Sequence, residues 1–234
     1  MPDFALPIDP LRSPHPIPWS WVLAIQEEYC DPAKISSRYY RTSSLISPNQ
    51  EYAAYSRLQL QIAPNPLANR VNSVLFIEHL STGTLQTPIA TSPLSHHPLY
   101  ATPEADEDGV FGFLIPISWS GEQDGELRLL ARQFEGIFGS SYASDYALVW
   151  EPHHGKGVTI APTNCDYTYS VLLGWSQSQP GSVLFQTGLL GKKESQNWAV
   201  DLAGNTLLVE AETPLIFGEV VNSIWTGPQS HYDS

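Results

Sequence analysis

Tight polar turns followed by short apolar runs recur three times between residues 43 and 213. Each copy begins with an apolar residue and a serine, at Ile46-Ser47, Trp119-Ser120 and Trp175-Ser176. The turns lie at residues 48–51, 121–125 and 177–181, and the apolar runs lie at 52–55, 127–131 and 183–185. Because the Gly, Pro and Asn residues of these turns supply the backbone angles of a hairpin, each copy predicts a strand, a turn and a strand.

A second hairpin signal follows each copy, at residues 73–88, 145–163 and 197–213, with a turn at Gly83, Gly155 or Gly204. Each unit therefore holds four antiparallel strands, which is the layout of a β-propeller blade. We predict an all-β fold with three four-stranded sheets, at residues 43–90, 112–163 and 170–213. Short helices are expected only near residues 20–30 and 94–100.

The repeated hairpins resemble the WD40-like (PD40-type) repeats of TolB-like β-propellers. That family carries a W/F-S-P-D-G-x-x-I/L-A-Y/F hairpin and then an I-W-x-x-D-x-x-T/S-G-x-x-x-x-L-T hairpin. "LISPNQEYAAYS" with "VLFIEHLSTGTLQT", "ISWSGEQDGELRLLA" with "YALVWEPHHGKGVTIA", and "LGWSQSQPGSVLFQ" with "NWAVDLAGNTLLVE" are similar to this pair. Asp124-Gly125 stands where the family has Asp-Gly, but no copy keeps the full Ser-Pro-Asp-Gly. The resemblance implies a propeller-like array over residues 43–213.

Three units leave open how the array closes, because propellers usually have four to eight blades. The segments "PWSWVLAIQEEYC" (18–30) and "PLIFGEVVNSIW" (214–225) lie outside the units. Together they form a fourth, composite blade in one interpretation. In the other, two chains pair as a homodimer to complete one ring. We expect residues 1–42 to be a Pro-rich arm with a short strand or helix, and residues 214–234 to be a strand and tail that pack on the blades.

The charge of the chain restricts its partners. A formal net charge of -13 repels nucleic acid and anionic lipid, whose binding depends on neutralising phosphate groups. A protein partner with a basic surface is compatible with this charge. The N-terminus lacks the basic start and apolar core of a signal peptide, and no stretch has the apolar length of a transmembrane segment. We therefore expect a cytoplasmic protein in which Cys30 and Cys165 are reduced thiols, with a disulfide between them as the alternative.

Candidate chemistry is sparse in the sequence. The Pro-rich loop 89–110 holds an acidic cluster of Glu104, Asp106, Glu107 and Asp108, which would dock a basic partner or a metal ion, or form a solvated surface. His96-His97 and His153-His154 are adjacent pairs, and neighbouring residues of a strand point to opposite faces, so we assign no metal site. Neither a G-x-S-x-G elbow nor a Gly-rich phosphate loop is present. We therefore assign no catalytic residue and no cofactor.

The tryptophans divide into two groups. Trp119 and Trp175 occupy matching positions in their units, as do Trp150 and Trp198, which predicts core packing between units. Trp19, Trp21 and Trp225 lie outside the units and are our candidates for partner binding, together with the acidic cluster of loop 89–110.

The sequence favours a non-catalytic protein-interaction or scaffold protein built on TolB-like blades, since no active-site constellation is visible. The alternative is a hydrolase with a loop-built site on the propeller face.

Overall fold

The computed structural model describes residues 9–29, 35–65, 68–93, 110–121, 126–137 and 140–221. These residues form one α-helix, α1 (Trp19–Tyr29), and the β-strands β1 to β14. The prediction of an all-β protein is confirmed, and α1 lies where a short helix was expected. The other expected helix, near residues 94–100, lies outside the described residues.

The first unit contains five strands: β1 (Ser36–Arg41), β2 (Ser44–Ile46), β3 (Tyr52–Ile62), β4 (Arg70–His79) and β5 (Thr84–Gln86). β1 and β2 pair with opposite halves of β3, and β3, β4 and β5 follow as antiparallel neighbours. The unit thus begins at Ser36 rather than near residue 43. β3 is 11 residues long, so β1 is needed to pair with the half of β3 that β2 does not reach.

The second and third units are antiparallel meanders of four consecutive strands. The second contains β6 (Val110–Trp119), β7 (Leu129–Ile137), β8 (Ala143–Glu151) and β9 (Lys156–Ile160). The third contains β10 (Tyr169–Trp175), β11 (Val183–Gly188), β12 (Ser195–Val200) and β13 (Thr206–Val209).

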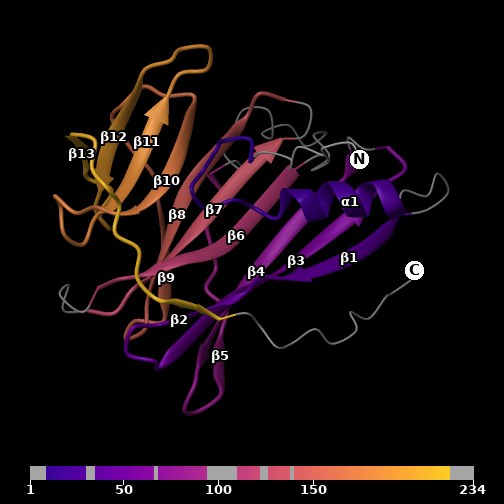
Figure 1. Cartoon of the computed structure of the whole chain (residues 1–234), viewed down its shortest axis with the longest axis horizontal. Coiled ribbons are helices and arrows are strands. Elements are labelled where there is room, and N and C mark those ends of the chain that lie inside the picture. The colour runs from indigo at the N-terminus through magenta and orange to yellow at the C-terminus, as the bar shows by residue number, and fades with distance from the viewer. Residues whose placement is uncertain are drawn as a thin grey trace, which may run out of the picture.

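The three units form two sheets rather than the three separate sheets that the repeats predict (Figure 1). The third unit is a sheet by itself. The first and second units are joined because Val71 of β4 and Phe111 of β6 form one parallel bridge. Beyond that bridge the hydroxyl of Ser73 continues the connection, since it accepts a hydrogen bond from the Leu114 amide (2.5 Å) and donates to the Gly112 carbonyl (3.3 Å).

The repeated serines that open the first hairpin of each unit are buried and have matching roles. The Oγ atom of Ser47 accepts a hydrogen bond from the Tyr52 amide, Ser120 Oγ from the Arg128 amide, and Ser176 Oγ from the Gln179 amide. Each serine therefore satisfies a turn amide that would otherwise lack a partner, which explains why serine recurs at this position.

Two hydrophobic cores lie between successive units. The core between the first and second units contains Trp119 and Trp150, and the core between the second and third contains Trp175. Trp119 and Trp175 are almost completely buried, so the prediction that they are core residues is confirmed. Trp198 is only half-buried and donates a hydrogen bond to Thr187.

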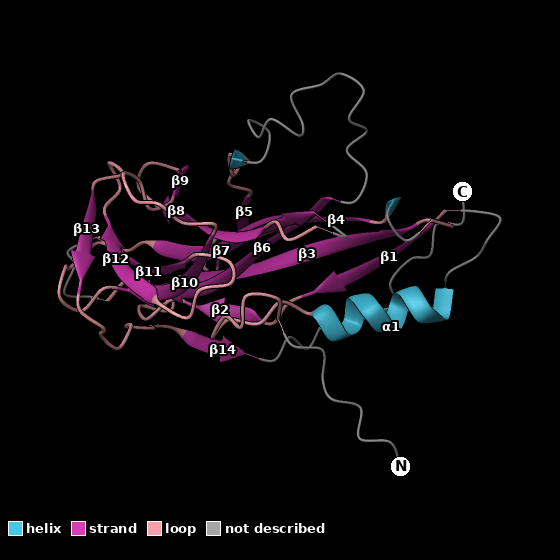
Figure 2. Ribbon diagram, turned by 90° about the horizontal axis from the view of Figure 1, so that it is seen from above, coloured by secondary structure: helices cyan, strands magenta, loops and turns pink. Residues whose placement is uncertain are grey.

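A third core lies under α1, at the end of the structure opposite the four-stranded sheet (Figure 2). Ile17 and Val22 pack there against Leu58, Leu60 and Ile62 of β3. α1 therefore covers one side of the first unit.

Residues 214–221, here called the C-terminal strap, contact all three units. Leu215 forms a bridge with Trp175 at the end of β10, and Phe217 forms one with Trp119 at the end of β6. β14 (Glu219–Val221) then pairs with β2. Within the described residues the two ends of the chain do not pair with each other, since α1 packs on the side of the first unit. These residues therefore do not form the composite fourth blade.

Candidate interaction surface and a buried polar cluster

The side of the first unit that points away from α1 carries a mixed basic and aromatic surface. Residues alternate between the two sides of a strand. Because Leu58 and Leu60 of β3 pack under α1, Arg57 and Gln59 lie on the opposite side. Cross-strand pairing extends this side onto β1 and β4. We call it the Arg-aromatic face; its members are Tyr39, Arg41, Tyr55, Arg57, Gln59, Gln61, Arg70, Asn72, Val74 and Phe76.

The centre of the Arg-aromatic face is a set of stacked side chains. The rings of Tyr55 and Phe76 are stacked, with centroids 5.5 Å apart and an interplanar angle of 12°. The Arg41 guanidinium lies 3.8 Å from the Tyr55 ring centroid, and that of Arg57 lies 5.5 Å from the Phe76 centroid. Both distances are typical of cation–π contacts, so the rings orient the two cations.

Arg41 is held from a second direction as well. Its Nη2 donates to Ser44 Oγ (3.1 Å) and its Nη1 donates to the Thr42 carbonyl (3.2 Å). Solvent reaches the face, because Arg57 and Asn72 are exposed and Val74 retains 47% of its accessible surface.

The face is basic in a chain that is strongly acidic as a whole. Residues 36–86 contain four arginines, and Glu51 and Glu78 are their only acidic residues, whereas the whole chain carries a formal charge of -13. Residues Tyr39 and Arg41 of β1, and Tyr55 and Arg57 of β3, share a Tyr-x-Arg spacing. In a strand, that spacing places both side chains on one side, and this signal in the sequence could have located the surface.

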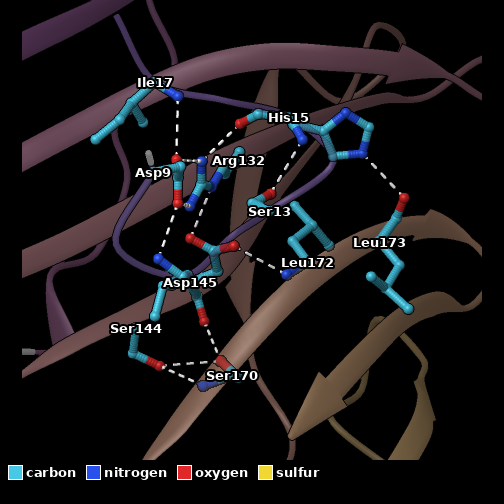
Figure 3. Close-up of polar contacts among 11 residues, drawn as sticks. Asp9, Ser13, His15, Ile17, Arg132, Ser144, Asp145, Ser170, Leu172 and Leu173 are labelled. Atoms are coloured by element: carbon cyan, nitrogen blue, oxygen red, sulfur yellow. Dashed lines mark hydrogen bonds and ion pairs between the residues drawn. The ribbon is translucent and has the colours of Figure 1, made fainter. Parts of the chain in front are cut away.

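A buried ionic cluster centred on Arg132 lies elsewhere in the fold (Figure 3). Arg132 of β7 is fully buried and contacts two carboxylates. Its Nε donates to Asp145 Oδ1 (2.7 Å), and its Nη1 donates to Asp9 Oδ2 (2.7 Å) and to the His15 carbonyl (2.6 Å). Charge-assisted hydrogen bonds of this kind are the strong ones in proteins.

The cluster joins three parts of the chain that are distant in sequence. Asp9 also accepts hydrogen bonds from the Leu11 and Ile17 amides, which fixes the path of residues 9–17. Asp145 of β8 accepts a hydrogen bond from the Leu172 amide of β10 (2.9 Å), and this links the two sheets. His15 Nε2 donates to the Leu173 carbonyl (2.9 Å), because a carbonyl can only accept.

The two carboxylates of the cluster have different acidities. Burial raises the pKa of Asp145 to about 6, although the Arg132 charge and the Leu172 amide oppose this change. Burial also acts to raise the pKa of Asp9, but the hydrogen bonds and charge of Arg132 outweigh it and leave that pKa below its ordinary value. Burial lowers the pKa of His15, which favours the neutral imidazole. Both carboxylates bind one buried guanidinium. The cluster therefore holds residues 9–17, β7, β8 and β10 together and has a structural role.

A groove of about 450 Å³ opens between β4 and β6, where the two strands diverge beyond their single bridge. The buried carboxylate of Glu135 lies in it and accepts hydrogen bonds from Gln133 Nε2 (2.8 Å) and Ser92 Oγ (3.1 Å). The described residues that line the groove include no histidine, cysteine or lysine. Among these residues, Ser92 has the Glu135 carboxylate as a hydrogen-bonded base, but the described lining lacks the histidine of a Ser-His pair.

The structure places only two of the predicted partner-binding residues. Trp19 and Trp21 are half-buried on α1, where Trp19 contacts Phe111 edge-on (5.5 Å) and Trp21 contacts Tyr40 (5.2 Å). Both rings thus contribute to the core under α1. The other predicted residues, Glu104, Asp106, Glu107, Asp108 and Trp225, lie outside the described residues, and their role stays a prediction.

Comparison with known proteins gives no family for this chain: no protein-family model matches it, and no curated protein matches it. Among the described residues, no three His, Cys, Asp or Glu side chains are grouped so as to hold a metal ion. The described helical segment is too short to cross a membrane. Cys165 is a free, partly exposed thiol, and Cys30 lies outside the described residues.

Proposed function

We propose that the chain is a non-catalytic protein-interaction or assembly module built on three propeller-like units. One observation carries this proposal: the first and third units, at the two ends of the array, each present a side that no described unit covers. In the first unit this side is the Arg-aromatic face. In the third it includes Leu207, which opposes Ala199 and retains 52% of its accessible surface.

The propeller-like part of the proposal is supported by the repetition of contacts from unit to unit. Each unit is an antiparallel meander that begins its first hairpin with a buried serine. The core between each two successive units includes a tryptophan from the first hairpin of the later unit. The TolB-like resemblance of the sequence agrees with this repetition. A chain of three such units has open end sides, and these are the natural docking surfaces of the molecule.

A hydrolase is less well supported by the described residues. The groove between β4 and β6 pairs the Ser92 hydroxyl with the carboxylate of Glu135, but its described lining has no histidine or lysine that would complete a nucleophile–base arrangement. The Arg132 cluster is inaccessible to a substrate. We therefore propose a protein partner, with a second copy of the chain as the alternative. The cytoplasmic location is proposed as the sequence predicts it.

The test compares Leu207→Glu with Val158→Glu, using the tagged full-length chain in its native cell. Val158 is a matched control because it lies on β9 of the second unit and has a similar exposure of 43%. Cross-linking followed by mass spectrometry should give a defined set of partners for the wild-type and control chains, and Leu207→Glu should lose part of that set. A chain that cross-links to nothing, or only to copies of itself, contradicts a hetero-partner role; hydrolysis of ester or peptide substrates by the pure chain would favour the enzyme.

A further inference from the structure

We infer that a pocket between residues 10–12 and the third unit binds a small organic anion. The carboxylate or phosphate group of this ligand lies on Arg12 and Lys192, and its apolar part lies on Leu189 and Leu190. This inference goes beyond the proposed interaction function and does not rest on it, because it concerns a small molecule and a different surface.

The pocket lies where three parts of the chain that are distant in sequence meet. The first part is residues 10–12, the second is the turn between β7 and β8, and the third is Tyr169 with residues 189–192. Its volume of about 450 Å³ falls in the range of pockets that accept small molecules. A bound molecule would therefore contact the N-terminal segment, the second unit and the third unit together.

The charged side chains of the pocket all have one sign. Arg12 and Lys192 line it, and its described lining contains no Asp or Glu, although the whole chain has a formal charge of -13. Neither cation has an ion-pair partner among the residues that the structure describes. A cleft lined by charges of one sign attracts ions of the opposite sign, so this lining favours an anion.

The backbone of Arg12 is held in an uncommon conformation. Its φ angle of 51° lies in the left-handed region, which residues other than glycine rarely adopt. The Asp9 carbonyl imposes this turn by accepting a hydrogen bond from the Arg12 amide (2.8 Å). The Asp9 carboxylate is itself fixed by the buried Arg132 (Figure 3). The buried cluster therefore supports the strained turn, and the site of the first cation is preorganised.

Lys192 lies in the turn of the hairpin between β11 and β12, and this turn is also fixed. The Leu190 amide donates to Thr168 Oγ1 (2.7 Å), and the Lys192 amide donates to the Leu189 carbonyl (2.9 Å). Leu190 nevertheless retains 64% of its accessible surface. Because burying apolar surface is favourable, a ligand with an apolar part beside its anionic group uses both features of this turn.

Two neutral side chains of the lining can donate hydrogen bonds to an anion. Tyr169 lies opposite Gly188 in the register of β10 and β11, and a Cβ atom at Gly188 would overlap the Tyr169 hydroxyl. The Tyr169 ring thus lies across this glycine. Among the described residues, neither the Tyr169 hydroxyl nor the Ser141 hydroxyl has a hydrogen-bond partner. Hydroxyl groups donate readily to carboxylate and phosphate oxygens, which adds to the preference for an anion.

The experiment titrates five probes against the full-length chain and follows binding by ligand-detected NMR. Octanoate and octyl phosphate combine an anionic group with an apolar chain, and they distinguish a carboxylate ligand from a phosphate ligand. Acetate and inorganic phosphate carry the anionic group alone. Octylamine carries the same chain with the opposite charge.

The protein variants test the two halves of the pocket separately. Arg12→Gln and Lys192→Gln each remove one cation, and Lys193→Gln is the matched control, since Lys193 is exposed but does not line the pocket. Leu190→Ser removes apolar surface, and Leu207→Ser is its control at an exposed leucine outside the pocket. All five side chains are exposed, and circular dichroism melting checks that each variant is folded.

At least one of the two octyl anions should bind more tightly than its anionic group alone, and octylamine should not bind. Arg12→Gln and Lys192→Gln should each weaken that binding by about two- to fivefold, the effect of one exposed ion pair. Leu190→Ser should weaken it as well, while Lys193→Gln and Leu207→Ser should leave it unchanged.

Four results would overturn the inference. They are no binding of either octyl anion, equal binding of octylamine, equal losses in Lys193→Gln and Lys192→Gln, or binding of acetate or inorganic phosphate that is as tight as that of the octyl compounds. The cross-linking test of the proposed function uses other variants, so its outcome is independent of these.

Discussion

The indole Nε1 of Trp175 donates a 2.7 Å hydrogen bond to the backbone carbonyl of Trp119. The indole Nε1 of Trp119 donates in the same way, over 3.2 Å, to the carbonyl of Leu45. Each bond runs from one unit to the preceding unit, so the two tryptophans connect all three units in series. Both indoles are almost fully buried, and a buried N–H that lost its carbonyl would be left unsatisfied.

Replacing Trp119 or Trp175 with alanine should therefore act on stability. Each substitution removes a large buried ring and should lower the free energy of unfolding by about 3–5 kcal/mol, as measured by urea denaturation. Leu208→Ala, at an exposed position of β13, is the control and should change it by less than about 0.5 kcal/mol. A loss below about 1 kcal/mol for either tryptophan would mean that its ring does not pack as described.

Asp145 should make stability fall as the pH rises from about 4 to about 6. Its pKa in the folded chain is about 6, above the ordinary value of 3.8, so the folded state holds a proton in this range that the unfolded state has released. Asp145→Asn should remove this part of the pH dependence. It should also lower the free energy of unfolding by about 2–4 kcal/mol near pH 4 and by less near pH 7, because the amide nitrogen of asparagine cannot accept the hydrogen bond that the second carboxyl oxygen accepts.

The measurement is a set of urea melts of wild type and Asp145→Asn between pH 4 and 7. Asp9 contributes in the opposite sense and at lower pH: its pKa is lowered in the folded chain, so its contribution is lost as the pH falls below its ordinary value of 3.8. If the stability curves of wild type and Asp145→Asn run parallel between pH 4 and 6, Asp145 is not the cause of the fall in stability over that range.

Gly218 should tolerate a side chain less well than Gly204. Both have positive φ angles, 108° and 84°, which disfavour any other residue. A Cβ atom at Gly218 would lie 2.8 Å from the Ile46 carbonyl oxygen and 2.9 Å from Trp119, whereas one at Gly204 would meet nothing within 4 Å.

Gly204→Ala should accordingly cost about 1–2 kcal/mol through backbone strain alone. Gly218→Ala should cost roughly 1–3 kcal/mol more, because it pushes the strap away from β2. Equal losses for the two variants in thermal or urea melts would show that the strap does not pack closely there.

Removing residues 214–234, or residues 1–30, should cause aggregation or a change of oligomeric state. The first deletion uncovers the ends of β6 and β10 and the edge of β2, and the second uncovers the core under α1 and removes Asp9 from Arg132. Unpaired strand edges and exposed apolar surface favour association. Light scattering tests this, and a truncated chain that stayed monomeric and equally stable would contradict it.

Local signals account for what the sequence predicted well. The serine, glycine and proline of each turn act through backbone angles and hydrogen bonds within a few residues, and the matching tryptophans reflect one core position repeated in successive units. β1 was not recognised as part of the first unit because "SSRYYR" is half-exposed and has no apolar run. The bond between Arg132 and Asp9 spans 123 positions, and no local pattern marks either partner.

The sequence predicted a C-terminal strand but not the strands that it contacts, and it did not predict the junction of the first two units, for a related reason. Leu215 and Phe217 bind the other units through backbone groups, which every residue has. The Ser73 bridge between β4 and β6 depends on a divergence of strands that only the packed units create. Trp19 and Trp21 were expected at an interface because they lie outside the repeats, but the core under α1 accommodates both rings.

The strap also sets an order of events during synthesis. Residues 214–221 follow all three units in the chain, so a ribosome releases the units before it releases the segment that pairs with them. During that interval the edge of β2 and the ends of β6 and β10 have free backbone groups and can capture a strand from a neighbouring nascent chain. The yield of correctly folded protein should thus depend on how quickly the last segment is translated, and slow codons after the third unit would lower it without any change in the finished molecule.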